Sequence, residues 1–580
     1  MQRLKATLLI QKANNLCESS AEIDAARSLF QIADSVSNLI RYSFLTEDSR
    51  LTLSETTLPI YEHAIELSYQ LYQCRQQKSD LENIFAFIEK SKALTLYESL
   101  QVSSARQNDL LPDSLEAAME KLKWDLTFYR RQIWERPNAS EELVKTWKEQ
   151  LFSLEQADRK QQQYLRRNYP QTTNLSFVPP QLDELEDRLP DGTALMEYFM
   201  GENHLYRLMI LGGQSSCVQI PLDGTLESSL RGLRNFLSGR LQAAEADLNH
   251  YQAFVADSRL LYETLLTGLT PSAVNELIII PDGRLNYLPF DLLLTEEGGN
   301  LEQIDYYRLP YLLQTCAVVY QYSAKILLAE QKLTNPSLLR FGGFAPSYSG
   351  TGSLAIPGRD SASRMGLAPL VNTPQEVSNI QSIRGGRIFL GPDASRESFL
   401  HIADSLSVIH LAMHSLTYDD APAYSSLVFT ESEGESNLLY AMDIANLDLK
   451  AEMAVLSACN TGTGHIRRGE GVMSLARAFR KAGCPNIVMS LWQADDLATS
   501  KIMQSFYAYL DQGQSRQAAL RQAKLDFLVQ STDRAHPHYW SAFVLFGEVE
   551  LEESGLPWWW LLLGITLLGG GVMLLRSRTS

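Results

Sequence analysis

The first 105 residues carry apolar side chains at spacings of three and four positions, which is the pattern of amphipathic helices. The stretches AARSLFQIADSVSNLIRYSF, YEHAIELSYQLYQCR and LENIFAFIEKSKALTLYESL show it most clearly. Glycine and proline are rare in this part, so we expect a helical region over residues 1–105, built from stacked helix pairs. A full 34-residue repeat signature is not evident.

Residues 106–176 keep a helical pattern over two longer segments, which are separated by the polar stretch ERPNASEE. Asn138 or Ser140 can cap the second segment, because Glu141 and Glu142 follow in its first turn. We predict a long helical hairpin that serves as a spacer.

From residue 177 onward, short apolar runs alternate with amphipathic stretches. The apolar runs include ELIIIP, LSVIHLAMH, MAVLSAC and NIVMSLW, and GVMSLARAFRKAG is an amphipathic stretch between the last two. This alternation predicts an α/β domain over residues 177–552, with a mainly parallel sheet that is flanked by helices.

The last part of the chain has no charged residue from Trp558 to Leu575. A run of this length is near the minimum for crossing a bilayer, and tryptophans at one end and arginines at the other suit the two interfaces. We therefore predict a single C-terminal transmembrane helix at residues 556–576. Arg576 and Arg578 favour a cytoplasmic tail, but no signal sequence is evident, so we expect the preceding domain to be cytoplasmic.

The composition disfavours several classes of function. A formal net charge of −17 over 580 residues argues against non-specific nucleic-acid binding, which needs a basic surface. The six cysteines are scattered and form no CxxC pair, so they predict neither a disulfide framework nor a zinc site, and they suit a reducing compartment. The loop CNTGTGHIRRGEG matches neither common glycine-rich phosphate-binding pattern, and we expect no cofactor and no metal.

Two of the predicted strands end in residues that can carry out chemistry. LSVIHLAMH ends at His414, and MAVLSAC ends at Cys459. Ligands of open α/β sheets bind beyond the carboxyl ends of the strands, and adjacent parallel strands lie about 5 Å apart. If these two strands are neighbours, the imidazole and the thiol project into the same crevice. A thiolate that attacks a carbonyl carbon, with a histidine that handles the proton, is the arrangement of a cysteine nucleophile.

Each of these residues also has a simpler explanation. A cysteine is often a small buried hydrophobic residue, and a histidine within a strand is often a packing residue. His410 is a rival base, but its place inside the apolar run indicates burial, and His465 in the following loop is a second rival. We prefer His414 over both. Glu470 either supports the cysteine loop or caps the next helix, and we favour a structural role.

Five stretches together support a family resemblance. They are IIIPDGRLNYLPFDLL, VIHLAMHS, LSACNTGTG, GEGVMSLARAFRKAGCPNIVMSLWQADD and HPHYWSAFVLFGE. Residues 181–550 resemble the CHAT domain, a caspase-like module that is related to separase and often attached to tetratricopeptide (TPR) repeats. The resemblance implies a caspase-like fold, TPR-like helices before it, and a cysteine endopeptidase with a dyad of His414 and Cys459. The position after the histidine, often a glycine whose N–H serves the oxyanion hole, is Ser415 here.

The resemblance also implies where substrates and partners bind. Asp495 and Asp496 follow a strand in SLWQADD, and separase-like enzymes have a similar stretch, so we expect Asp496, with Asp495, to receive a P1 Arg or Lys. A helix N-cap is the alternative. We predict a membrane-tethered peptidase that cleaves a protein partner at limited sites in bacterial signalling or defence, with a protein regulator on its N-terminal helices. The alternative is a catalytically silent scaffold that assembles partners through those helices.

Overall fold

The computed structural model describes most of the chain. Two predicted features lie outside the described residues: the segment 556–576 and Cys459. The described ranges are 21–44, 46–107, 111–169, 177–238, 247–299, 301–329, 341–348, 353–355, 364–431, 436–458, 461–462 and 464–552.

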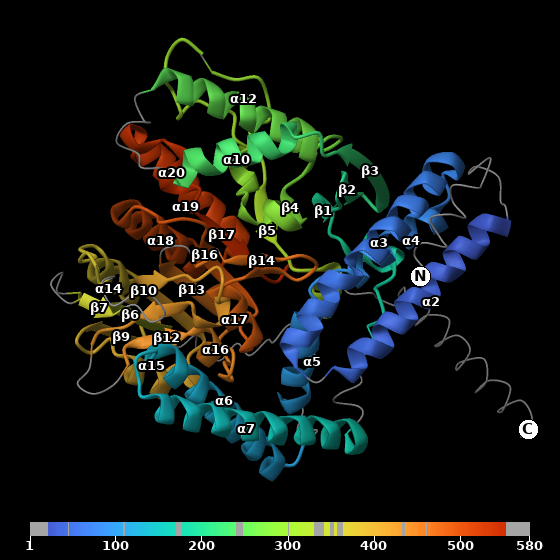
Figure 1. The fold of residues 1–580 in the computed structure, drawn as a ribbon. Helices are drawn as coiled ribbons and strands as arrows, with labels where there is room; N and C mark the ends of the chain where they lie inside the picture. The colour runs from blue at the N-terminus through green and yellow to red at the C-terminus, as the bar shows by residue number, and fades with distance from the viewer. Residues whose placement is uncertain are drawn as a thin grey trace, which may run out of the picture.

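Helices form the described part of the N-terminal region (Figure 1). They are α2 (Ala21–Ser43), α3 (Glu47–Arg75), α4 (Lys78–Lys90), α5 (Leu94–Gln107), α6 (Asp113–Glu135) and α7 (Glu141–Asn168). The hydroxyl of Thr46 caps α3 by accepting the N–H of Ser49, and α3 ends where Gln76 adopts a left-handed conformation. Ser140 caps α7 by accepting the N–H of Leu143, so it is Ser140 rather than Asn138 that begins this helix.

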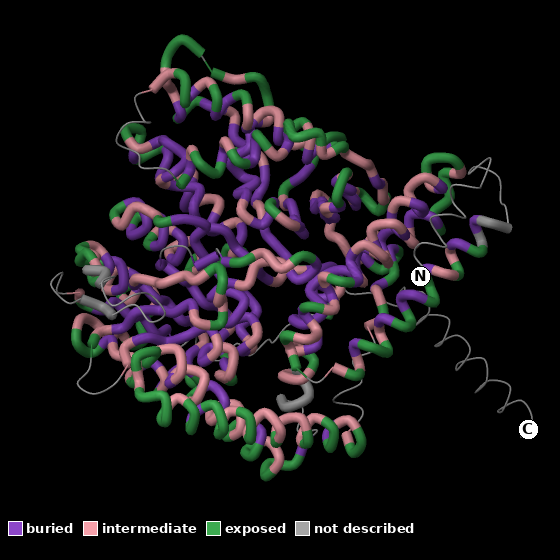
Figure 2. The backbone as a smooth tube through the Cα atoms, viewed as in Figure 1, coloured by how far each residue is buried: buried purple, intermediate pink, exposed green. Residues whose placement is uncertain are grey.

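The α6–α7 hairpin lies against the sheet domain and is not free-standing (Figure 1). The ring of Trp134 stacks on that of Tyr424, with 4.2 Å between the ring centroids. Glu135 accepts hydrogen bonds from the hydroxyls of Tyr440 and Ser436, at 3.0 Å and 2.9 Å. The outer helix α7 buries only Trp147 and Leu165 among its described side chains, which agrees with its exposed colour in Figure 2.

One sheet organises the rest of the described chain, with the strand order β12-β11-β10-β13-β16-β17-β5-β4-β1-β2-β3 and with β6 and β9 beside β10. Its strands are β1 (Thr193–Met200), β2 (His204–Leu211), β3 (Gln214–Pro221), β4 (Glu276–Ile280), β5 (Ala317–Tyr320), β6 (Phe341–Pro346), β9 (Arg387–Gly391), β10 (Val408–Leu416), β11 (Ser426–Val428), β12 (Leu438–Tyr440), β13 (Met453–Ala458), β16 (Asn486–Ser490) and β17 (Phe543–Phe546). Two short pairs stand apart: β7 (Ser353–Ala355) with β8 (Arg364–Gly366), and β14 (His465–Arg467) with β15 (Gly471–Met473).

The sheet is mixed, with a parallel centre and antiparallel ends. β6, β10, β13 and β16 run parallel, whereas β1–β2–β3 and β10–β11–β12 are antiparallel, as is the β16–β17 pair. A tight turn through Gly212 and Gly213, both at positive φ, reverses the chain between β2 and β3 and makes that pair antiparallel. The predicted α/β fold after an N-terminal helical region is confirmed.

Helices pack against the sheet and bury its apolar side chains. They are α9 (Leu182–Arg188), α10 (Thr225–Ser238), α12 (Leu248–Leu265), α13 (Ala324–Ala329), α14 (Thr373–Arg384), α15 (Arg396–Ile402), α16 (Ala441–Ile444), α17 (Leu475–Lys481), α18 (Asp496–Asp511), α19 (Arg516–Gln530) and α20 (Pro537–Trp540). All residues of β13 and β16 are buried, and buried residues fill the sheet in Figure 2. Strands with both faces covered read as continuous apolar runs, as MAVLSAC and NIVMSLW do.

The predicted membrane anchor is not supported. Among the helices of the described ranges, none is both long enough and apolar enough to span a bilayer. The two longest, α3 and α7, carry acidic and basic residues along much of their length. The prediction of a single-pass transmembrane helix, and of a membrane localisation that depends on it, is therefore corrected and forms no part of the function proposed below.

Candidate active site

β10 and β13 lie side by side at the centre of the candidate site. The two strands are parallel neighbours, and their register pairs Met413 with Ala458. The residues that follow this pair in the chain are His414, which is half-buried on β10, and Cys459, which lies outside the described residues. The prediction depended on these two strands being neighbours, and the register shows that they are. β10 continues past His414 to Leu416, so the prediction that this strand ends at the histidine is wrong.

His414 is held in one orientation by two contacts. Its Nε2 lies 2.7 Å from the carbonyl oxygen of Ala368. A carbonyl can only accept, so Nε2 carries a proton, and Nδ1 is the ring nitrogen that is left to exchange one. The backbone N–H of His414 donates to the hydroxyl of Tyr348 at 3.1 Å, and that hydroxyl donates to the carbonyl of Val428 at 2.6 Å. The ring of Tyr348 packs on the imidazole with 4.7 Å between centroids.

Ser490, at the end of β16, is bonded to residues that precede and follow Cys459 in the chain. Its hydroxyl donates to the carbonyl of Ala458 at 2.5 Å, and its backbone N–H donates to the hydroxyl of Thr461 at 3.2 Å. Its own carbonyl accepts the N–H of Gly462 at 2.9 Å. We did not predict a role for Ser490 or Thr461. The available signal was that Ser490 ends a third strand of the sheet.

The cysteines that the structure describes are unsuited to act as nucleophiles. Cys217, Cys316 and Cys484 are free and buried, and burial raises the pKa of each thiol to about 12. A thiol with that pKa supplies almost no thiolate near neutral pH. Cys74, at the end of α3, is disulfide-bonded, so the expectation that the cysteines are reduced is wrong for this residue.

A cleft opens above the carboxyl ends of β10, β13 and β16. It encloses about 1180 Å³, open solvent included. Its lining comes from α10, from the 3₁₀ helix η2 (Gly283–Tyr287) and from the segments that follow the three strands: Arg234, Leu237, Ser238, Tyr287, Thr417, Asp419, Gly464, His465, Ile466, Leu491 and Trp492. The cleft therefore combines apolar walls with one guanidinium and one carboxylate.

Tyr287 joins the wall of this cleft to the segment after the cysteine. Its hydroxyl donates to the carbonyl of Gly464, and the guanidinium carbon of Arg234 lies 4.4 Å from the centroid of its ring. Burial raises the pKa of Tyr287, so the hydroxyl keeps its proton and remains a donor. These contacts fix α10 against the segment that begins β14.

The rival histidines occupy different environments. His410 is fully buried, with Nε2 2.8 Å from Glu376 and Nδ1 3.3 Å from the hydroxyl of Tyr507, so the prediction that it is buried is confirmed. His465 is exposed, begins β14 and lines the cleft.

The acidic pair after β16 is engaged by protein groups. Asp495 caps α18 by accepting the N–H of Ala498 at 2.9 Å, and it lies 3.0 Å from Arg534. Asp496 accepts the N–H of Asn372 at 2.8 Å. The N-cap alternative therefore describes Asp495. Ser415 lies on β10 opposite Leu427 of β11, and neither it nor the two aspartates line the cleft.

Within the described part of the chain, no cluster of His, Cys, Asp and Glu side chains is arranged to hold a metal ion.

A model of the CHAT domain matches residues 255–548, which is about half of the chain. The chain belongs to the CHAT domain family. Two curated relatives share part of it. The human tetratricopeptide repeat protein 28 is 26% identical over 345 residues, which cover 51% of this chain and 13% of the relative. The mouse protein of that name is 29% identical over 192 residues, 32% of this chain and 7% of the relative. The chain thus spans a small part of either relative, and its N-terminal helices are TPR-like.

Two solved structures are similar to this CHAT protein at low sequence identity. A separase–securin complex from Saccharomyces cerevisiae is 9% identical, with a TM-score of 0.43, over 94% of this chain and 51% of the other. The Arg-specific cysteine proteinase gingipain R is 11% identical, with a TM-score of 0.32, over 57% of this chain and 75% of the other.

In this CHAT domain, the loop after the cysteine is bonded to the TPR-like helices through Glu470. The carboxylate is buried and accepts the backbone N–H of Thr95 at 3.1 Å, the hydroxyl of Ser54 at 3.1 Å and Nη2 of Arg477 at 2.9 Å. Its role is structural, and its partners belong to α3, α5 and α17. A sequence pattern contains no signal for such distant partners.

Gly469 completes this contact. Its carbonyl accepts the N–H of Ala93 at 2.7 Å, and its φ is +79°. A Cβ at this position would lie 2.7 Å from the carbonyl oxygen of Ser91, so only glycine fits between the β14–β15 hairpin and the turn that joins α4 to α5.

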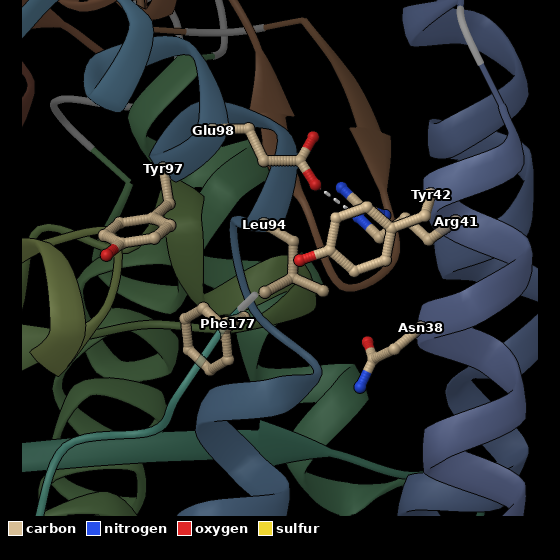
Figure 3. Close-up of a pocket in the computed structure, with 7 residues that line it drawn as sticks. All are labelled: Asn38, Arg41, Tyr42, Leu94, Tyr97, Glu98 and Phe177. Atoms are coloured by element: carbon tan, nitrogen blue, oxygen red, sulfur yellow. Dashed lines mark hydrogen bonds and ion pairs between the residues drawn. The ribbon is translucent and has the colours of Figure 1, made fainter. Parts of the chain in front are cut away.

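A second cavity lies between α2 and α5 and is lined by none of the predicted site residues (Figure 3). Figure 3 shows Arg41 and Tyr42 of α2 facing Leu94 and Glu98 of α5. Arg41 Nε lies 2.6 Å from Glu98, and Arg41 Nη2 lies 3.8 Å from Glu470. Arg41 therefore links the ion pair drawn in Figure 3 to Glu470, which bonds the β14–β15 hairpin to the TPR-like helices.

Proposed function

We propose that this chain is a cysteine endopeptidase that cleaves a protein partner at limited sites, with Cys459 as nucleophile and His414 as base. The observation that carries the proposal is the register of β10 and β13, which pairs Met413 with Ala458. The residue after Met413 is His414, the residue after Ala458 is Cys459, and an open cleft lies above this end of the sheet.

The proposed reaction uses these two side chains in sequence. Nδ1 of His414 accepts the thiol proton, and the sulfur forms a bond to the scissile carbonyl carbon. Collapse of the tetrahedral species breaks the C–N bond, and the imidazolium gives its proton to the leaving amine. Water then hydrolyses the thioester, with the same imidazole as base, and restores the thiol. The bond from Nε2 to Ala368 supports this assignment, because it leaves Nδ1 as the basic atom.

The N–H groups of Cys459 and Ser415 are the candidate donors to the oxyanion. Ser490 supports the first of these, since its hydroxyl holds the carbonyl of the peptide that joins Ala458 to Cys459. A planar trans peptide places its C=O and N–H on opposite sides, so a fixed carbonyl also fixes the donor.

The direct test is peptide cleavage by the purified full chain, first alone and then with candidate protein partners. Products of a defined cleavage site, absent with the Cys459→Ala protein, would support the proposal. An unreactive Cys459 thiol and no cleavage under any of these conditions would favour the scaffold alternative, in which the TPR-like helices assemble partners.

For P1 we propose a preference for Arg or Lys over Asp, read by Asp495 and Asp496. Asp495 already pairs with the guanidinium of Arg534, which is the contact that a substrate arginine would replace. We expect kcat/KM for Arg-ended peptides to exceed that for Asp-ended peptides at least tenfold, because a carboxylate repels a second carboxylate.

Asp495→Asn should lower the ratio of kcat/KM for Arg-ended peptides to kcat/KM for Asp-ended peptides. Asp404→Asn, at an exposed position before β10, should leave this ratio unchanged. Equal kcat/KM for the two peptide series in the wild type would remove the pocket assignment and leave the peptidase proposal intact.

A further inference from the structure

Glu376 of α14 is a buried carboxylate that holds both strands of the proposed dyad. Its Oε1 lies 2.8 Å from Nε2 of His410 on β10 and 2.7 Å from the hydroxyl oxygen of Ser457 on β13. Glu376 and His410 are fully buried, and Ser457 is 7% exposed. A carboxylate only accepts, so both neighbours donate to the same oxygen.

These contacts lie on the face of the sheet toward which His414 points. Residues two apart on a strand share a face, so His410, Ala412 and His414 point the same way. The register pairs Ala412 with Ser457, and paired residues of neighbouring parallel strands share a face as well. Ser457 stands two positions before Cys459. Glu376 therefore bonds to both strands, to β10 four residues before His414 and to β13 two residues before Cys459.

The segment that leads into α14 also reaches His414. The carbonyl of Ala368 holds Nε2 of His414, and four residues later the N–H of Asn372, the N-cap of α14, donates to Asp496 of α18. α14 and the segment before it thus make contacts with both strands. Ala368 binds the imidazole of His414, and Glu376 binds β10 and β13. Asp496 fastens that helix at its N-terminus.

His410 is a poor candidate for proton transfer to a substrate, which leaves a positioning role. Burial raises the pKa of Tyr507 well above its usual value, so its hydroxyl keeps the proton and can donate to Nδ1 of His410 at 3.3 Å. Both ring nitrogens are then occupied by protein groups, and the ring has no access to solvent.

Retaining a carboxylate at this place costs stability relative to apolar packing. Oε2 of Glu376 has no hydrogen-bond partner among the described residues, although the side chain is fully buried. The best-attested use of such a costly polar group is to specify one register of neighbouring elements over its alternatives. Here the elements are the two strands whose ends form the proposed dyad.

We propose that Glu376, with His410 and Ser457, is a positioning residue that fixes β10 against β13 and so sets the alignment of His414 with Cys459. The inference rests on the proposed function. The contacts of Glu376, His410 and Ser457 are all between described residues, and the proposed reaction steps do not use these three side chains.

Ser457→Ala is the mildest test, because it removes the β13 arm of the network and leaves a small side chain in place. We expect kcat to fall about tenfold with KM unchanged within twofold, since a small misalignment of reacting groups affects the chemical step rather than binding. The rate of Cys459 alkylation by iodoacetamide between pH 5 and 9, measured by peptide mapping, should fall at least threefold near neutral pH.

Ser541→Ala is the matched control. Ser541 is fully buried, and its hydroxyl donates to one backbone carbonyl, that of Pro537 at 2.8 Å, after α20. Glu376→Gln keeps an acceptor oxygen for both donors and should retain kcat within threefold of the wild type.

An alkylation profile of Ser457→Ala that overlays that of Ser541→Ala would overturn the inference, whether or not the protein cleaves peptides. A clear difference between the two profiles without any wild-type turnover would keep the positioning role and count against the peptidase proposal. Equal losses in Glu376→Gln and Ser457→Ala would show that the negative charge is required in addition to the acceptor.

Discussion

Replacing Cys459 with alanine is expected to lower peptide cleavage by roughly 10³-fold or more, and His414→Ala by roughly 10²- to 10⁴-fold. The first change removes the atom that forms the acyl bond, and the second removes the group that accepts and returns the proton. Because the two side chains would act as a unit, the double variant should be no worse than Cys459→Ala alone. Initial rates with fluorogenic peptides, together with active-site titration by a peptide aldehyde, measure all three.

The control for the histidine is His401→Ala, an exposed histidine on α15, which should leave cleavage at the wild-type rate. The rival base is tested by His465→Ala. A larger loss for His465→Ala than for His414→Ala would move the base to β14, although the bond between Nε2 of His414 and Ala368 argues for His414.

The second large effect is expected on stability. Glu470→Ala should lower the free energy of unfolding by about 3–5 kcal/mol, because it leaves the buried guanidinium of Arg477 without its carboxylate. The backbone N–H of Thr95 and the hydroxyl of Ser54 lose their acceptor in the same step. Urea unfolding followed by circular dichroism, with the midpoint and the slope compared with those of the wild type, measures this loss.

Glu55→Ala provides the matched control at the same contact. Glu55 of α3 lies 3.3 Å from Arg467 of β14, and both side chains are about one-third exposed. An ion pair this exposed contributes only about 0–1 kcal/mol, since water and salt screen it. Similar unfolding midpoints for Glu470→Ala and Glu55→Ala would contradict the assignment of Glu470 as the main link between the TPR-like helices and the β14–β15 hairpin.

The strands that carry the candidate site were predictable because their sequences are continuous apolar runs. LSVIHLAMH and MAVLSAC correspond to β10 and β13, and residues 408–413 and 453–458 of these strands are all buried, which removes the need for alternating polar positions. Their adjacency was a condition of the prediction and not a result of it, and the register of the two strands supplies it. The membrane anchor was predicted from hydropathy and from the tryptophans and arginines that flank the apolar run, and no described helix supports it.

The acidic residues show where local pattern stops being informative. Asp495 fits both a helix cap and a substrate pocket, since either needs a carboxylate just before a helix, and the structure places it in the cap and beside Arg534. Glu376 and Glu470 look in sequence like any solvated helix or turn carboxylate, yet both are buried. Nothing in their neighbours along the chain marks that difference.

The amino-acid pattern was sufficient to predict the type and order of the elements, the apolar strands that carry or precede a histidine and a cysteine, and the family resemblance. The folded chain was needed to show which polar groups are hydrogen-bonded: Glu376 with a serine 81 positions away, and Glu470 with one 416 positions away. The difference lies in the distance along the chain over which each kind of information acts. Burial patterns repeat every two or every three to four residues and can be read locally, whereas a buried hydrogen bond depends on two segments whose approach is fixed by the packing of everything between them.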